Sequence, residues 1–313
     1  MLNRKDIQII SENSNLSKNQ IDYLLKENVY QQQKDWFLFL KYFTLSIGIS
    51  FLSIGILFFF AYNWQDLHRF FKLGILEFLI IITTLLAIKF SETKILLSNI
   101  LLTSATLLVG VLFAVFGQIY QTGANAFDFF LGWTIAVFIW VIATKFEPLW
   151  LLYISLLNIT YFMYIEQIAK HWSDDNIAFI LLVLNIPVLL FFTFFKSKLE
   201  IKKWLIQILA IYLVLIGTIT ILQGIFKIVT TYYWFNLFIV SAFYIWLIWH
   251  AVKEKSIFYI ALISVSLISI FNALIFKITT NSIKFLYIGF FTIIATTLLV
   301  KFISELKNRW KDA

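Results

Sequence analysis

Long apolar stretches recur along this chain, and they restrict its possible folds more than any other feature. Each is roughly 17–25 residues long, which is enough for an α-helix to cross the ~30 Å hydrocarbon core of a bilayer. These stretches are apolar on all sides rather than alternating, which argues against a β-barrel. The sequence therefore predicts an all-α, polytopic integral membrane protein with about ten transmembrane helices. The predicted spans are 41–62, 71–88, 95–116, 127–144, 149–165, 177–195, 204–223, 232–251, 257–276 and 285–303.

The composition agrees with that fold class. Of the 313 residues, 61% are apolar and only 13% are charged, with a mean hydropathy of +0.88. An ordinary soluble domain is about 45–50% apolar and about 25% charged, so that class is excluded. The absence of Cys excludes disulfides and thiolate metal sites. No apolar core occurs before about residue 36, so we expect the first span, rather than a cleaved signal peptide, to direct insertion.

The basic residues predict the orientation of the spans. The net charge of +8 could indicate a nucleic-acid partner, but much of it lies in short connections beside the apolar stretches, so we expect none. Successive connections lie on alternate sides of the membrane, and with ten spans both termini lie on the same side. That side carries 19 of the 25 Lys and Arg residues. Cytoplasmic connections of membrane proteins are enriched in Lys and Arg. Both termini are therefore predicted to lie in the cytoplasm.

Residues 1–35 precede the first span and read as a small cytoplasmic segment. Ser17 and Gln20 fit a capping box, and apolar residues at helical spacing follow, which predicts a helix over 18–30 and an earlier one over 4–11. The segment is either a helical hairpin packed on the membrane surface or a docking site for a cytoplasmic protein. We divide the rest into the transmembrane bundle, residues 36–304, and a basic cytoplasmic tail, residues 305–313.

Two polar stretches on the predicted outer side are candidate parts of a binding site. The first is "AYNWQDLHRF" after the first span, and the second is "FGQIYQTGANAFDFF" after the third. Amides, a phenol and carboxylates can bind a polar small molecule or a lipid headgroup. The same residue types also occur as interfacial anchors and helix ends, so a structural role stays open. The candidates in these stretches are Asn63, Trp64, Asp66, Gln118, Tyr120, Gln121, Asn125 and Asp128.

Glu77 is the remaining candidate, because it lies inside the second predicted span. A carboxylate at such depth is unfavourable in lipid and commonly faces a cavity or a partner. Alternatively, Glu77 reaches the headgroups or pairs with Arg69 or Lys72. Other polar residues within the spans, including Asn158, Asn185, Asn236 and Asn272, are interpreted as contacts between helices.

Three features, in order, make the chain resemble a bacterial family of predicted membrane proteins, the domain of unknown function 2157. They are the helical segment ending near "QQQKDW", the "AYNW" that closes the first span, and "FGQIYQTGANAFDFFLGW" at the start of the fourth. The resemblance covers roughly residues 16–140. It implies a bacterial inner membrane and directs attention to the two outer motifs, but it supplies no catalytic residue or substrate.

Three functional hypotheses remain. The first is a transporter or lipid-translocating carrier with an outward-facing polar cavity. The second is a non-catalytic assembly or sensor protein that binds a partner through residues 1–35. The third and weakest is a membrane-embedded transferase, with Asp66 as its acid and His68 or His171 as a base. The sequence favours a protein that is not an enzyme, and we expect no catalytic residue, metal or cofactor, since only three His occur and no phosphate-binding loop is present.

Overall fold

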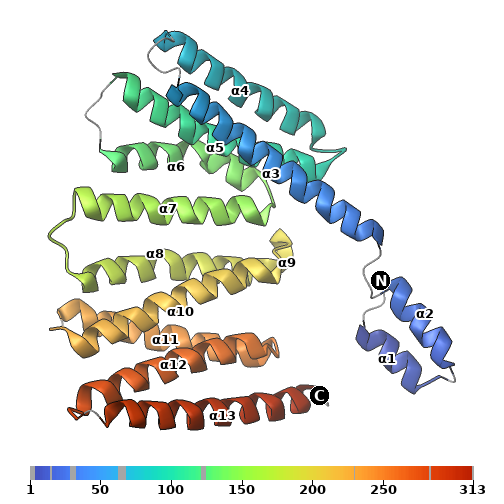
Figure 1. Cartoon of the computed structure of the whole chain (residues 1–313), viewed down its shortest axis with the longest axis vertical. Coiled ribbons are helices and arrows are strands. Elements are labelled where there is room, and N and C mark those ends of the chain that lie inside the picture. The colour runs from blue at the N-terminus through green and yellow to red at the C-terminus, as the bar shows by residue number, and fades with distance from the viewer. Residues whose placement is uncertain are drawn as a thin grey trace. The chain divides into compact units, whose positions relative to one another are not determined.

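A computed structural model describes residues 4–14, 16–28, 33–62, 68–120, 125–228, 230–281 and 283–311. Within these residues every regular element is a helix (Figure 1). The helices are α1 (Arg4–Glu12), α2 (Lys18–Asn28), α3 (Gln33–Tyr62), α4 (Arg69–Phe90), α5 (Ile95–Tyr120), α6 (Ala126–Ala143), α7 (Glu147–Gln167), α8 (Asp174–Phe194), α9 (Lys196–Leu199), α10 (Lys203–Phe226), α11 (Thr231–Lys253), α12 (Ile257–Ile278) and α13 (Lys284–Lys311).

The predicted fold class is confirmed. Among the described residues, 10 helices are long and apolar enough to cross a membrane, and they coincide with the ten predicted spans. Most helices extend beyond the apolar stretch at one or both ends, as α5 does by continuing to Tyr120. Hydrogen bonding within the helix is independent of side-chain polarity, so a helix can continue into the headgroup region. For the same reason α13 carries the predicted basic tail as far as Lys311.

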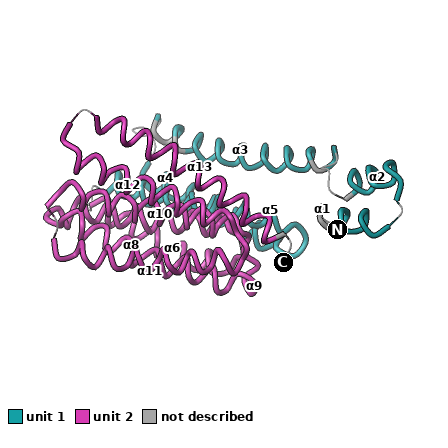
Figure 2. Tube along the Cα trace, turned by 90° about the horizontal axis from the view of Figure 1, so that it is seen from below, with its two compact units in different colours: residues 1–122 teal, residues 123–313 magenta. Residues whose placement is uncertain are grey.

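The chain divides into two compact units, residues 1–122 and residues 123–313, which Figure 2 shows in different colours. In the first unit, α1 packs against α2, and Ile7 is buried. Half of the predicted capping box is present, because the backbone N–H of Ser17 donates to Oε1 of Gln20 over 2.9 Å. The Ser17 hydroxyl donates to the same oxygen, while the backbone N–H of Gln20 bonds to the Ser17 carbonyl oxygen. The packed helices α1 and α2 form a helical hairpin, and its position on a membrane surface stays a prediction.

The larger part of the first unit is an antiparallel pair, α4 and α5, with α3 packed on α5. Leu76 and Val115 are the buried centre of this contact. The Ser98 hydroxyl donates to the carbonyl oxygen of Ala87 over 2.6 Å, next to the turn that joins the two helices. Apolar packing along the helices and this bond near the turn set the register of the pair.

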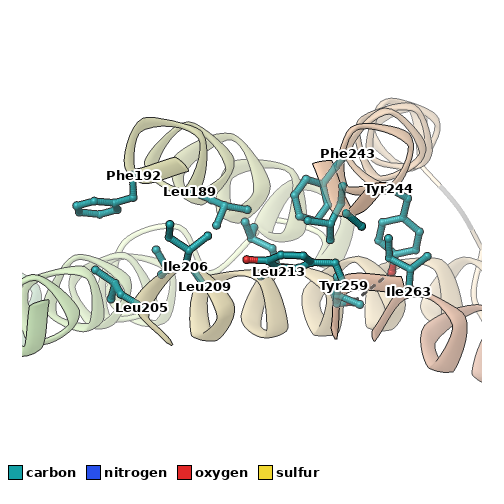
Figure 3. Close-up of a cluster of buried hydrophobic side chains, with 14 of the residues drawn as sticks. Leu189, Phe192, Leu205, Ile206, Leu209, Leu213, Phe243, Tyr244, Tyr259 and Ile263 are labelled. Carbon is teal, nitrogen blue, oxygen red and sulfur yellow. Dashed lines mark hydrogen bonds between the residues drawn. The ribbon is translucent and has the colours of Figure 1, made fainter. Parts of the chain in front are cut away.

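The second unit contains the main apolar core, built from α8, α10, α11 and α12 (Figure 3). Leu182, Leu189 and Leu205 are completely buried there. Large apolar side chains such as Phe238 and Ile245 instead face outward from α11. Lipid solvates outward side chains as well as the core does, so close packing and hydrogen bonds hold such a bundle together.

Two glycines let α10 and α11 approach closely. A Cβ atom added to Gly217 would lie 3.0 Å from Val240, and one added to Gly224 would lie 1.9 Å from the ring of Tyr233. The two glycines are seven residues apart and therefore face the same side of α10. Small residues at such positions are a general means of packing membrane helices.

Polar residues within the spans of the second unit bond across helices, as the sequence predicted. Asn158 and Asn185 exchange amide hydrogen bonds of 3.0 and 2.9 Å between α7 and α8. Asn236 of α11 donates to the backbone carbonyl of Asp175 over 2.8 Å, and Asn272 of α12 donates to Thr292 over 2.9 Å. The interpretation of these asparagines as contacts between helices is confirmed.

A second cluster, which we call the hydroxyl cluster, consists of Thr218, Tyr244 and Ser266. The Ser266 hydroxyl lies 2.6 Å from both the Thr218 and the Tyr244 hydroxyls, and all three residues are buried. It joins α10, α11 and α12, each of which contributes one hydroxyl. Sequence reasoning did not single out this cluster, because isolated Ser, Thr and Tyr residues are common in membrane helices.

Candidate functional site

The structure describes five of the nine candidate residues. Asn63, Trp64, Asp66 and Gln121 lie outside the described residues. Glu77, Gln118 and Tyr120 belong to the first unit, and Asn125 and Asp128 belong to the second.

Glu77 lies in α4 on the side away from α5. Its neighbour Leu76 is completely buried against α5, and the next residue of a helix points about 100° away. The Glu77 side chain is accordingly exposed on the surface of the unit. It is eight residues from Arg69, which places it about 12 Å along the helix axis from the start of α4. The carboxylate is thus well inside a membrane-spanning helix.

Glu77 has no ion pair or hydrogen bond with any other described residue. In particular, the pairing with Arg69 or Lys72 that the sequence left open is not present among the described contacts. Lys72 is itself buried although it is only five residues away. The Glu77 carboxylate therefore remains available to water, a ligand or another protein surface.

Gln118 and Tyr120 lie at the end of α5, which runs antiparallel to α4. Both side chains are exposed, and the Tyr120 ring packs on Phe116 with a distance of 4.6 Å between ring centroids. No hydrogen bond joins either polar group to another described residue. Because α4 begins where α5 ends, both residues are at the same end of the helical pair as the first turns of α4.

Asn125 and Asp128 form the N-terminal cap of α6. The Asn125 backbone N–H donates to Oδ2 of Asp128 over 3.1 Å. The Phe127 backbone N–H donates to Oε1 of Gln167 over 2.8 Å, so α7 also caps α6. These bonds satisfy backbone donors that every helix start leaves free. Asn125 and Asp128 are both exposed, so this structural role leaves part of each side chain accessible.

A small polar pocket lies at the same end of the second unit, where α8 begins. It has a volume of about 140 Å³ and is lined by Ser173, Asp174, Asp175, Gln223, Gly224, Lys227, Ile228 and Thr230. Asp174 pairs with Lys227, and the buried Asp175 accepts hydrogen bonds from the backbone N–H and the hydroxyl of Thr230 at 3.0 and 2.8 Å. The acid-rich connection was visible in the sequence, but its partners are more than fifty residues away and no local spacing marks them.

The two carboxylates of the pocket have a structural role. Both carboxylates are already hydrogen-bonded or ion-paired within the unit, so they join the α7–α8 and α10–α11 connections. Within the described parts of the chain, no group of three or more His, Asp or Glu residues is arranged to hold a metal ion. The ion pair and hydrogen bonds at the pocket therefore hold the two connections together.

Comparison with known proteins finds a similarity for the first half of the chain only. No curated protein and no solved structure matches the chain. One family model matches residues 13–150, a range that contains α2 and both outer motifs on which the resemblance rested, whereas α1 lies before it. The chain is thus a polytopic membrane protein that over residues 13–150 is similar to the family of predicted membrane proteins DUF2157.

Proposed function

We propose that this chain is a membrane carrier for a small polar molecule or a lipid, located in a bacterial inner membrane with both termini in the cytoplasm. The observation that carries the proposal is the Glu77 carboxylate, which is exposed about 12 Å along a spanning helix and has no partner among the residues that the structure describes. An unpaired carboxylate in lipid is unfavourable by a few kcal/mol, so it persists where it meets water, a ligand or a partner.

In this proposal Glu77 lies on the wall of an outward-facing cavity. Gln118 and Tyr120, which belong to the same unit as Glu77, supply other polar groups of this cavity. A carboxyl group can exchange a proton or bind a cation, and either event would couple transport to an ion gradient. Gln118 and Tyr120 support the arrangement because they are exposed at the end of α5 that adjoins the start of α4, and neither polar group bonds to another described residue.

Reconstituted vesicles test the proposal. The full chain is placed in liposomes and given two probes, a defined mixture of sugars, amino acids and organic acids read by mass spectrometry, and a lipid with a fluorescent headgroup. We expect uptake of one component, or movement of the lipid between leaflets, above the level of empty liposomes. Glu77→Gln should abolish that activity.

Glu92→Gln is the matched control, because Glu92 is an exposed carboxylate in the turn after α4 rather than within the span. It should leave activity unchanged. Equal activity of Glu77→Gln and the unmodified chain would remove Glu77 from the mechanism. If neither probe moves above the level of empty liposomes, the carrier proposal fails.

The α1–α2 hairpin favours a second candidate, an assembly or sensor protein. Ile9 and Tyr23 are 58% and 63% exposed on this hairpin, so apolar groups are available to a cytoplasmic protein. Deletion of residues 1–35 separates the two candidates. A carrier that folds keeps its transport after the deletion, whereas a docking protein loses a partner that the full chain captures.

A further inference from the structure

One end of the second unit gathers basic residues from three separate connections. These connections join α6 to α7, α8 to α10, and α11 to α12, and we call them together the lysine end. Successive spans run in opposite directions, so all three connections are at the same end of the unit (Figure 1). The lysine end carries Lys145, Lys196, Lys198, Lys202, Lys203, Lys253 and Lys255, but only three acidic residues, Glu147, Glu200 and Glu254.

Ion pairs join the three connections into one surface. The Lys145 ammonium lies 2.7 Å from Glu200, which links the first connection to the second. The Lys196 ammonium lies 3.3 Å from Glu254, which links the second to the third. Glu147 is buried and accepts the backbone N–H of Lys202 over 3.2 Å. Each of the three acidic residues of the lysine end therefore has a partner within it.

The remaining lysines keep their charge available. Lys198, Lys203 and Lys255 are exposed and have no acidic partner among the described residues, while the Lys253 ammonium lies 5.1 Å above the Trp249 ring. The bond from Lys196 holds the pKa of Glu254 below its usual range, and the charge of Lys203 also lowers it.

The neighbouring side chains are those of a membrane interface. Phe194 and Phe195 are exposed immediately before α9, a helix of only four residues. Glu200, with a φ of 59°, ends α9 in the left-handed conformation, and the next residue, Ile201, returns to the core. Trp249 near the end of α11 is also exposed, with Lys253 above its ring, and a Trp at the edge of the hydrocarbon with lysines just beyond it is typical of the headgroup region.

We propose that the lysine end binds the headgroup of an anionic phospholipid through Lys198, Lys203 and Lys255. The occupant follows from charge and position, because the surface adjoins the ends of spanning helices and has four more basic than acidic residues. The opposite end of this unit, by contrast, has equal numbers of basic and acidic residues. They are Lys170, Lys227, Lys277 and Lys284, and Asp128, Glu166, Asp174 and Asp175. Each lysine near an anionic membrane surface strengthens binding. The proposal is independent of any transport activity.

Lipid retention in detergent tests this proposal. The purified full chain is incubated with phosphatidylglycerol or phosphatidylcholine that have identical acyl chains, and native mass spectrometry counts bound lipids. We expect about tenfold tighter binding of phosphatidylglycerol, weakened by added salt. The triple variant Lys198→Gln/Lys203→Gln/Lys255→Gln should bind both lipids equally. Soluble glycerol phosphate should not compete, which distinguishes a lipid from a free phosphate.

Two further triple variants make the result decisive. Replacing Lys170, Lys277 and Lys284 at the opposite end by Gln removes the same charge and should leave the preference intact. Replacing Lys198, Lys203 and Lys255 by Arg keeps the charge and should also preserve it, so a folding defect of the Gln variant would not hide the answer. Loss of preference in the opposite-end or Arg variant, or no preference in the unmodified chain, would overturn the proposal and leave these lysines as a signal for membrane orientation only.

Discussion

At the scale of single residues, the spans contain two kinds of polar group. Asn158 is fully satisfied, because its carbonyl oxygen accepts from Asn185 and from the Tyr212 hydroxyl while its amide nitrogen donates to Asn185 and to Ile154. Glu77 lacks any such partner among the described residues. Satisfied groups stabilise the bundle, whereas an unsatisfied charge indicates contact with something outside its own unit.

The asparagine pair gives a prediction for a double-mutant cycle. Asn158→Leu and Asn185→Leu each remove both hydrogen bonds between the two amides and should lower the free energy of unfolding by about 1 kcal/mol. The double variant should lose less than the sum of the two, because either single change already removes both bonds. Unfolding in mixed micelles measures all three. Ser269→Ala on the exposed face of α12 is the control, and strict additivity at the asparagines would contradict a direct bond.

Gly224 gives a second prediction at this scale. A Cβ atom there would overlap the Tyr233 ring at 1.9 Å, so Gly224→Ala should lower the free energy of unfolding by about 1–3 kcal/mol through overpacking. Gly289→Ala is the matched control, because nothing lies within 4 Å of a Cβ at that position in α13. Alanine favours helix over glycine by up to ~1 kcal/mol, so the control should be neutral or stabilising. Equal melting temperatures of the two variants would refute the close approach of α10 and α11.

At the scale of elements, the connections are held by bonds that reach across the chain. Gln167 at the end of α7 caps the start of α6, and Asp175 in the first turn of α8 holds Thr230 before α11. The ion pairs of the lysine end act similarly at the opposite end of the unit. Short connections between spans thus gain order from neighbouring connections rather than from their own sequence.

The ion pair of Lys196 and Glu254 predicts a pH dependence. The Glu254 pKa is depressed in the folded chain, first by the hydrogen bond from Lys196, so its contribution is present above the ordinary value of 4.5 and is lost as the pH falls below it. The pair is partly exposed, which limits the effect to less than ~1 kcal/mol. Hydrogen exchange over residues 195–203, corrected for intrinsic rates, should therefore rise at about pH 4 relative to about pH 6.5. In Glu254→Gln this difference should vanish, and its persistence would assign the effect to another group.

At the scale of the whole molecule, the chain is a series of spanning helices whose basic residues concentrate at alternate connections. In the second unit the lysine end has an excess of four positive charges, whereas the opposite end is balanced. Such an asymmetry sets the direction in which spans insert. The orientation with both termini in the cytoplasm remains a prediction.

Single cysteines test that orientation, because the chain contains none of its own. Asn281→Cys, in the connection between α12 and α13, should react with a membrane-impermeant maleimide applied to intact cells. Ser197→Cys, in α9, should react only after the membrane is opened. Both side chains are exposed, so accessibility depends on the side of the membrane alone. The reverse pattern would invert the orientation and place Glu77 nearer the cytoplasmic side.

The sequence by itself determined the class of fold and the number of spans. A backbone in hydrocarbon must satisfy its hydrogen bonds internally, so each long apolar stretch has to be a helix, and the bilayer thickness sets its length. The contact between Ser17 and Gln20 at the start of α2 and the match to a family of membrane proteins over residues 13–150 were also accessible from sequence. These features depend on residues that are close together in the chain.

Only the tertiary structure decided which faces of the helices meet. Because the spans are apolar on all sides, no amphipathic stripe reveals which face turns inward. The partners Asn158 and Asn185 are 27 residues apart, and Lys196 and Glu254 are 58 apart, so no spacing in the sequence marks them. For the same reason the sequence left Glu77 either paired or free, and the packing of Leu76 against α5 decided that Glu77 faces away from it.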